Sequence, residues 1–238
     1  MDVTSSSQPL TQWGGFQGRR RLSDSPYIQS VWEGIALRDG THKTAADGTI
    51  DLTFQARRGI RRLLLSGPTS KAQTTFFEAG DEVLSVRLRT GVFIPALAGT
   101  GLADVDMSLP SFGPGRFRWQ HLALSFPSFD TVEAFADHLA KLRLLQRDIV
   151  VEDALVARTR DISLRTIQRH FLGTTGLTMG HIRQIRRAEQ ARGLLAGPHT
   201  LTAIAYETGY SNPGHMTNAF NYFFGQTPSA MRALMTSP

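Results

Sequence analysis

The segment Thr200-Leu-Thr-Ala-Ile-Ala-Tyr-Glu-Thr-Gly209-Tyr-Ser-Asn212-Pro213-Gly-His has the residue order of two helices joined by a tight turn. Thr200 is a suitable N-cap, and Gly209 suits the left-handed conformation that ends many helices. Asn212 is the next N-cap, and Pro213 occupies the first helical position, where its missing N–H costs nothing. A short helix, a glycine turn and a helix with a polar outer face together predict a helix-turn-helix.

The same landmarks occur once more in the chain, 49 residues earlier. The aligned pairs are Ser163 with Asn212, Ile167 with Met216, Phe171 with Phe220, Gly176 with Gly225, Thr178 with Thr227, and Arg183 with Arg232. Chemically sensible matches at one offset indicate an internal repeat. Each copy therefore predicts a capped helix, a glycine stop, a second cap and a second helix.

The helices that follow Ser163 and Asn212 are the predicted recognition helices. Helical spacing places Leu164, Ile167 and Phe171 on a core face in the first copy, and Met216, Phe220, Phe223 and Phe224 on a core face in the second. The residues expected to face DNA bases are Arg165, Thr166, Gln168, Arg169, Gly214, His215 and Asn218. Arginine, glutamine, asparagine and histidine carry donors and acceptors that match base edges in the major groove.

Residues 178–196 are expected to form one basic helix between the two copies, ended by Gly197-Pro198. Such a rod fixes a separation, and recognition helices about 34 Å apart would meet successive major grooves. Side chains near the helix starts and on this rod are expected to contact phosphates: Ser163, Ser211, Asn212, Arg183, Arg186 and Arg187.

Residues 150–238 resemble the C-terminal domain of the AraC/XylS family of bacterial transcription regulators. The resemblance is carried by Ala203 through Asn212, by Gly225-Gln-Thr-Pro228, and by Ser163-Leu-Arg-Thr-Ile-Gln-Arg-His-Phe171. It implies a double helix-turn-helix that binds double-stranded DNA sequence-specifically, and contact with RNA polymerase. The chain departs from the family where Asn218 replaces a basic residue, and where the turn Arg158-Thr-Arg-Asp161 lacks the usual glycine.

Residues 26–126 have the pattern of β-strands. Leu84, Val86 and Leu88 alternate with polar residues, as in a half-buried strand. Residues 46–54, 66–68 and 86–91 are similar to a β-rich domain that precedes this DNA-binding unit in one branch of the family. We therefore expect an α+β protein of two domains, whose β-rich domain binds a small-molecule effector or a partner and modulates DNA binding.

Two further segments have open interpretations. Residues 1–25 are expected to be a flexible tail, with Arg19-Arg20-Arg21 either solvated or in contact with phosphates. Residues 127–149 are expected to be a connecting amphipathic helix that begins with a capping box from Asp130 to Glu133. Its apolar stripe either packs on its own domain or pairs two chains in a homodimer; the stripe comprises Val132, Phe135, Leu139 and Leu142.

Composition narrows the function. The 238 residues carry a net charge of +6, which suits an acidic partner such as nucleic acid. The absence of cysteine excludes disulfides, thiolate metal sites and cysteine nucleophiles, and fits the cytoplasm. No segment approaches the roughly 20 apolar residues of a membrane span.

An enzyme is not expected from this sequence. His42 and His121 are isolated, and a Gly-Lys-Ser phosphate loop is absent, so neither a cofactor nor a metal site is expected. The second alternative is an interaction protein that uses the helical fold without binding DNA. The arginines of the first recognition helix and of the linking helix favour DNA.

Overall fold

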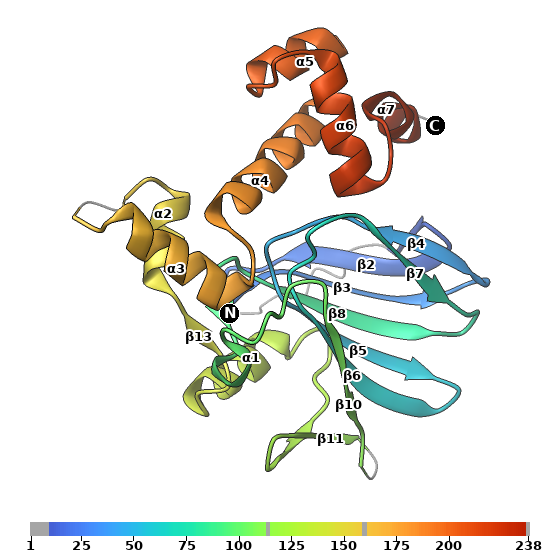
Figure 1. Ribbon diagram of the computed structural model, residues 1–238. Coiled ribbons are helices and arrows are strands. Elements are labelled where there is room, and N and C mark those ends of the chain that lie inside the picture. Colours follow the sequence, from blue (N-terminus) through green and yellow to red (C-terminus); the bar gives the residue numbers. More distant parts are fainter. Residues whose placement is uncertain (1–9, 113–114, 159–160, 237–238) are drawn as a thin grey trace, which may run out of the picture.

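The structure, a computed structural model, describes residues 10–112, 115–158 and 161–236, which form a β-rich N-terminal domain and a helical C-terminal domain (Figure 1). The strands are β1 (Thr11–Trp13), β2 (Phe16–Leu22), β3 (Ile28–Ala36), β4 (Gly40–Thr44), β5 (Asp51–Arg57), β6 (Ile60–Ser66), β7 (Gln73–Phe77), β8 (Glu82–Leu88), β9 (Val92–Phe93), β10 (Asp106–Pro110), β11 (Arg116–Trp119), β12 (Leu122–Ser125) and β13 (Gln146–Arg147). The helices are η1 (Pro95–Leu97, a 3-10 turn), α1 (Val132–Lys141), α2 (Ile149–Leu155), α3 (Leu164–Thr175), α4 (Met179–Leu194), α5 (Leu201–Glu207), α6 (Pro213–Phe224) and α7 (Pro228–Thr236). The predicted fold class is confirmed.

Seven antiparallel strands form the main sheet, in the order β1-β2-β3-β8-β5-β6-β10. Leu52 pairs with Val86 and Phe54 pairs with Leu84 across β5 and β8, and all four side chains are buried in the domain core. This core is the face that the alternation in residues 84–88 predicts. Helix α1 and the β11–β12 hairpin contribute the residues that cover it.

The predicted flexible tail is wrong for residues 11–22. These residues form β1 and β2, which extend the sheet along β3. Arg19 pairs with Glu33 at 2.7 Å, and Arg21 donates to the Phe129 carbonyl at 2.8 Å and binds Glu133. Local composition suggested a solvated run because the acidic partners of these arginines lie elsewhere in the sequence. Residues 1–9 lie outside the described part of the chain.

Helix α1 belongs to the N-terminal core rather than to a connection between domains. Val132 and Leu139 are fully buried within their own chain, so this part of the apolar stripe packs on its own domain, which is the first of the two expected alternatives. The expected capping box is also wrong, because the helix begins after Thr131 and the Glu133 carboxylate accepts from Arg21 and Ser23 instead. The strand pair β13–β9 then holds the following residues to the same domain.

The helical domain follows the repeat closely. Ser163 and Asn212 cap α3 and α6 by accepting from the backbone N–H three residues later, and Thr178 and Thr227 cap α4 and α7 in the same way. Gly176 and Gly225 end the recognition helices with φ of 69° and 65°. The repeat in sequence is therefore a repeat in structure.

The core of the helical domain is closed partly by the N-terminal domain. Ala46, from the segment between β4 and β5, is fully buried among residues of α3, α4 and α6. A side chain at Gly48 would place its Cβ atom 2.4 Å from Cδ1 of Ile182 on α4, so any residue other than glycine would require the Ile182 side chain to shift. The two domains are thus packed directly against each other.

Replacing Leu139 with alanine should lower the free energy of unfolding by about 2–5 kcal/mol, because the fully buried side chain leaves a cavity. Urea unfolding followed by circular dichroism measures the loss. Leu142, which is 37% exposed, provides the matched control, and its replacement by alanine should cost less than about 1 kcal/mol. Equal losses from the two variants would contradict the placement of α1 in the core.

Candidate nucleic-acid interface

The first recognition helix, α3, presents an exposed polar face. Arg165, Gln168 and Arg169 are exposed, and none of their side chains has a hydrogen-bond or ion-pair partner among the described residues. The ion pair between Arg169 and Asp161 that would make this arginine merely structural is therefore absent from the described part of the chain. Thr166 is half-buried, and its hydroxyl lies 2.9 Å from that of the cap residue Ser163.

The second recognition helix, α6, exposes its predicted face as well. Gly214, His215 and Asn218 are exposed, while Met216 and Phe220 are fully buried behind them. The His215 Nδ1 atom lies 3.1 Å from the Ser211 hydroxyl, which orients the imidazole at the helix start. The two predicted sets of base-facing residues thus lie on the outer faces of equivalent helices.

The predicted phosphate contacts divide into three groups. Ser163 and Asn212 are used as helix caps, and Ser211 holds His215. Arg183 is exposed on α4 without a partner among the described residues, and the Arg187 guanidinium lies 5.7 Å from the centre of the Tyr210 ring. Arg186 lines the cleft toward the N-terminal domain instead, and donates to the Leu155 carbonyl at 3.4 Å.

Sequence reasoning misplaced one core residue and missed one polar residue. Leu164 is 58% exposed because it occupies the first helical position, ahead of the buried turn that contains Ile167. Asp148 was not predicted: it caps α2 through two backbone N–H groups, accepts from the Thr174 hydroxyl at 2.8 Å, and lies 2.8 Å from His170 Nδ1. An Asp directly before an apolar helical segment is the N-cap signal that could have identified it.

The turn of the first motif is unusual. The position equivalent to Gly209 is Arg160, which lies outside the described residues. Just before it, Ala157 has a φ of 57°, a left-handed conformation that ordinarily favours glycine. The first motif therefore adopts a left-handed backbone conformation at Ala157 without a glycine there.

The N-terminal domain holds the C-terminal ends of both recognition helices. The Gly99 N–H donates to the Gly173 carbonyl of α3 at 3.1 Å, and the Ala72 N–H donates to the Tyr222 carbonyl of α6 at 2.9 Å. Residues 173 and 222 are separated by the repeat offset, so equivalent carbonyls are held in the two copies. The Ala46 N–H adds a bond to the Phe223 carbonyl at 2.7 Å. Carbonyls in the last turn of a helix have no partner within it, and these contacts satisfy them.

A buried carboxyl organises the segments that make these contacts. Asp47 accepts from the N–H groups of Thr49 and Thr69 and binds Arg87 at 2.8 Å. The pKa of Asp47 is raised to about 7, chiefly by burial and also by the neighbouring Asp51 carboxylate, against the opposing effects of Arg87 and of the two backbone N–H groups. The carboxyl therefore titrates near neutral pH while it holds together the two segments of the N-terminal domain that carry Ala46 and Ala72.

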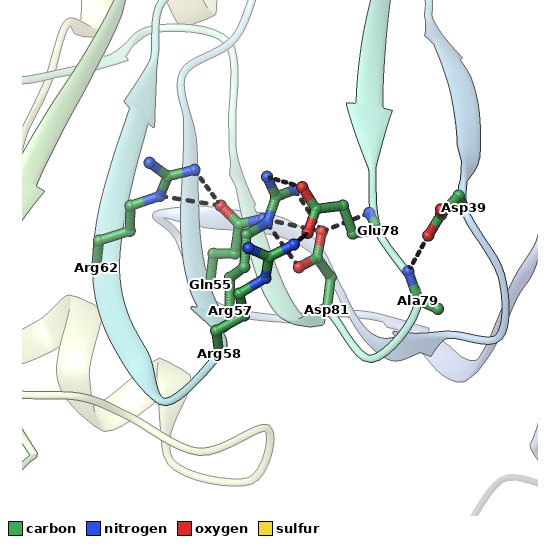
Figure 2. A network of polar contacts seen from close by, with 8 residues as sticks. All are labelled: Asp39, Gln55, Arg57, Arg58, Arg62, Glu78, Ala79 and Asp81. Atoms are coloured by element: carbon green, nitrogen blue, oxygen red, sulfur yellow. Dashed lines mark hydrogen bonds and ion pairs between the residues drawn. The ribbon is translucent and has the colours of Figure 1, made fainter.

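Three of the four arginines at the turn between β5 and β6 are paired with protein groups (Figure 2). Arg57 binds the buried Asp81, Arg58 binds Glu78 at 2.8 Å, and Arg62 donates to the Gln55 side-chain oxygen at 2.7 Å. This network stabilises a hairpin. It leaves those three guanidinium groups unavailable for the anion site that a run of arginines could otherwise form.

Within the described ranges, no group of three or more His, Asp or Glu side chains is arranged to hold a metal ion. None of the helices in that part of the chain has the length and apolarity needed to cross a bilayer.

Two capped recognition helices with exposed polar faces, joined by the rigid helix α4, define a double helix-turn-helix domain. Residues 156–233 match the family model described as "Helix-turn-helix domain". The C-terminal region is thus a helix-turn-helix domain of the AraC type, as its sequence predicts.

Curated relatives carry the same type of domain. The "HTH-type transcriptional regulator GlxA" of Rhizobium meliloti (strain 1021) is 34% identical over 102 residues, which cover 40% of this chain and 32% of the relative. The "HTH-type transcriptional activator RhaS" of Salmonella arizonae is 29% identical over 137 residues, which cover 55% of this chain and 49% of the relative. The matches therefore span about a third and about half of the lengths of these relatives.

Among solved structures, ToxT from Vibrio cholerae is similar with a TM-score of 0.42 and 12% sequence identity. The match covers 84% of this chain and 99% of ToxT.

The stability of the protein should depend on the protonation of Asp47. An unfolded Asp titrates near pH 4, so between about pH 4 and pH 7 the folded chain keeps a proton that the unfolded chain has released. The free energy of unfolding should then fall as pH rises across this window, by at most about 1.4 kcal/mol per pH unit for one proton.

Urea unfolding at about pH 5 and about pH 8 tests this for the wild type and for Asp47→Asn, in which the group cannot titrate. The wild type should lose more stability between the two conditions than the variant does. Identical losses in the two proteins would show that the Asp47 carboxyl takes up no proton in the folded state.

Proposed function

We propose that the protein is a transcription regulator that binds double-stranded DNA sequence-specifically, with α3 and α6 in successive segments of the major groove. The observation that carries the proposal is the exposed face of α3, where Arg165, Gln168 and Arg169 have no partner among the described residues. Arginine can bond to both acceptors of a guanine edge, and glutamine can bond to both polar groups of an adenine edge. A capped helix start presents such side chains to the bases.

The two recognition helices should contribute unequally. Arg165 and Arg169 on α3 carry full charge, whereas Gly214 on α6 has no side chain and Asn218 is neutral. Charged groups contribute both to base contacts and to the release of counterions from DNA. The α3 contacts are therefore proposed to supply more of the affinity and more of its salt dependence.

The competing function is an interaction domain that does not bind DNA. An affinity for duplex DNA that falls steeply with salt favours regulation by DNA binding. No acidic side chain of the described residues neutralises the exposed guanidinium groups on α3. An interaction domain that does not bind DNA gives no reason for such groups.

A small-molecule effector is best accommodated in the cleft between the domains. This cleft has a volume of about 510 Å³ and lies between Arg87 of the sheet and Ile182, Arg186 and Glu189 of α4. Thr49 lines the cleft, and its buried hydroxyl has no hydrogen-bond partner among the described residues. A polar ligand in the cleft would contact both domains at once.

The remaining partners and the location depend on the same proposal. A regulator bound at a promoter lies next to RNA polymerase, which we include as a partner. It acts where bacterial DNA is, in the cytoplasm. Catalysis has no part in this proposal.

Replacing Arg169 with alanine should weaken binding to the operator by about 1–3 kcal/mol and relax specificity in one half of the site. Replacing Asn218 with alanine should cost less and leave the slope of log affinity against log salt nearly unchanged. Operator fragments selected from random duplex DNA, followed by binding measurements at several salt concentrations, provide the test.

Arg61→Ala is the matched control, since Arg61 is an exposed arginine of the β-rich domain without a partner among the described residues. It should bind the operator like the wild type, and all three variants should melt near the wild-type temperature. A larger loss from Asn218→Ala than from Arg169→Ala would reverse the proposed asymmetry. Equal, small effects of Arg169→Ala and Arg61→Ala would count against base recognition by α3.

A further inference from the structure

The first recognition helix does not stand alone: a segment of the N-terminal domain lies beside its exposed face. A groove of about 730 Å³ separates them, lined by Arg165, Gln168 and Arg169 on α3 and by Gly99 and Gly101 on the loop after η1. The face that carries the predicted base contacts is therefore one wall of a groove whose other wall comes from the β-rich domain.

A helix in the major groove is flanked by the two sugar-phosphate strands that border that groove. A protein segment fixed beside the recognition helix, level with its outer face, must then lie along one of those strands. From this geometry we propose that the loop of residues 98–102 is part of the DNA-binding surface and receives a DNA backbone strand in the groove beside α3. This inference rests on the proposed function and assigns the N-terminal domain a direct contact with DNA.

The composition of the loop suits a phosphate strand. From Pro95 to Ala103 the loop carries neither an acidic nor a basic side chain, so nothing in this segment repels phosphate by charge. Gly99 and Gly101 adopt φ of 74° and 75°, and the space beside each α-carbon is open, which permits close approach of a strand. Gly101 is an exposed residue, and its N–H has no acceptor among the described residues. Backbone N–H groups of this kind are frequent donors to phosphate oxygens.

The loop is fixed at both ends, which favours a permanent wall over a movable cover. Gly99 is bound to the Gly173 carbonyl of α3, and Leu102 is buried in the core of the β-rich domain. A Cβ atom at Gly176 would lie 3.0 Å from the Ala103 nitrogen, so the end of α3 and the loop are in close contact. Asp104, the next residue, accepts from the Ser70 N–H at 2.8 Å and from its hydroxyl at 2.6 Å.

A pair of opposite charges at one position tests the proposal in the full-length protein. Gly101→Lys should bind operator DNA on the order of fivefold more tightly than the wild type, with a salt slope steeper by about 0.9, the value of one added phosphate contact. Gly101→Glu should bind more weakly by a similar factor. Both variants carry the same left-handed backbone strain, so the difference between them reports charge.

Gly59 provides the matched control pair, Gly59→Lys and Gly59→Glu. It also has a positive φ, of 79°, with open space beside its α-carbon. It lies in the turn between β5 and β6, at the opposite end of the view from α3 (Figure 1). The two Gly59 variants should differ little in DNA affinity, and circular dichroism should show all four variants folded.

The outcomes separate the possible roles of the loop. Opposite effects at Gly101 that exceed those at Gly59 support a DNA contact. An equal difference in DNA affinity between Lys and Glu at Gly101 and at Gly59 overturns the DNA contact. Tighter binding by both Gly101 variants also overturns it, because that result would show that the wild-type loop obstructs DNA and that the substitutions loosen it. Arg169→Ala distinguishes failure of the loop contact from failure of the proposed function. If Arg169→Ala weakens DNA binding while the Gly101 pair behaves like the Gly59 pair, only the loop contact is wrong.

Discussion

The arrangement of the molecule depends on backbone hydrogen bonds that the β-rich domain donates to the last turns of the two recognition helices. A helix end leaves carbonyls without partners, and these need satisfaction where they are removed from water. Gly99 supplies the N–H for α3, and Ala46 and Ala72 supply N–H groups for α6. Because the Gly99 and Ala72 bonds meet equivalent positions of an internal repeat, connecting segments of one domain hold both recognition helices, and α4 is not the sole determinant of their separation.

The segments that donate these bonds are themselves held by buried charge. Asp47 ties the residues after β4 to those after β6, and Arg87 anchors it from β8 of the main sheet. An ion pair in such a place contributes little net stability, because desolvation opposes the attraction, but losing one partner is costly. Its contribution is geometric. It holds together the two segments that carry Ala46 and Ala72, and their N–H groups in turn hold the end of α6 against the N-terminal domain.

The sequence predicted the helical domain well because its determinants are local. Caps such as Ser163 and Thr178, and stops such as Gly176 and Gly225, act within a few residues, and an offset repeat reveals them twice. The errors concern long-range pairing. Arg19 and Arg21 looked solvated because their carboxylates, Glu33 and Glu133, lie outside the local segment. The two interpretations of the α1 stripe stayed open because the sequence does not show which β-strands cover it. The loop of residues 98–102 has neither charged residues nor a periodic pattern. Its position beside α3 therefore follows from the three-dimensional fold and could not be predicted from the sequence.

In the proposed function the β-rich domain binds an effector and the helical domain binds DNA, and these contacts would couple the two domains directly. Residues that line the interdomain cleft, such as Asp47 and Thr49, directly precede or follow the segments that hold α6, and Arg87 connects them to the sheet. A ligand in the cleft would therefore act on the bonds that fix the recognition helices, without a separate transmitting element between the domains. A shift of one helix relative to the other changes how well both fit one face of DNA, since each must meet its own groove segment. The coupling between a bound ligand and DNA affinity can thus reside in the packing of the two domains themselves.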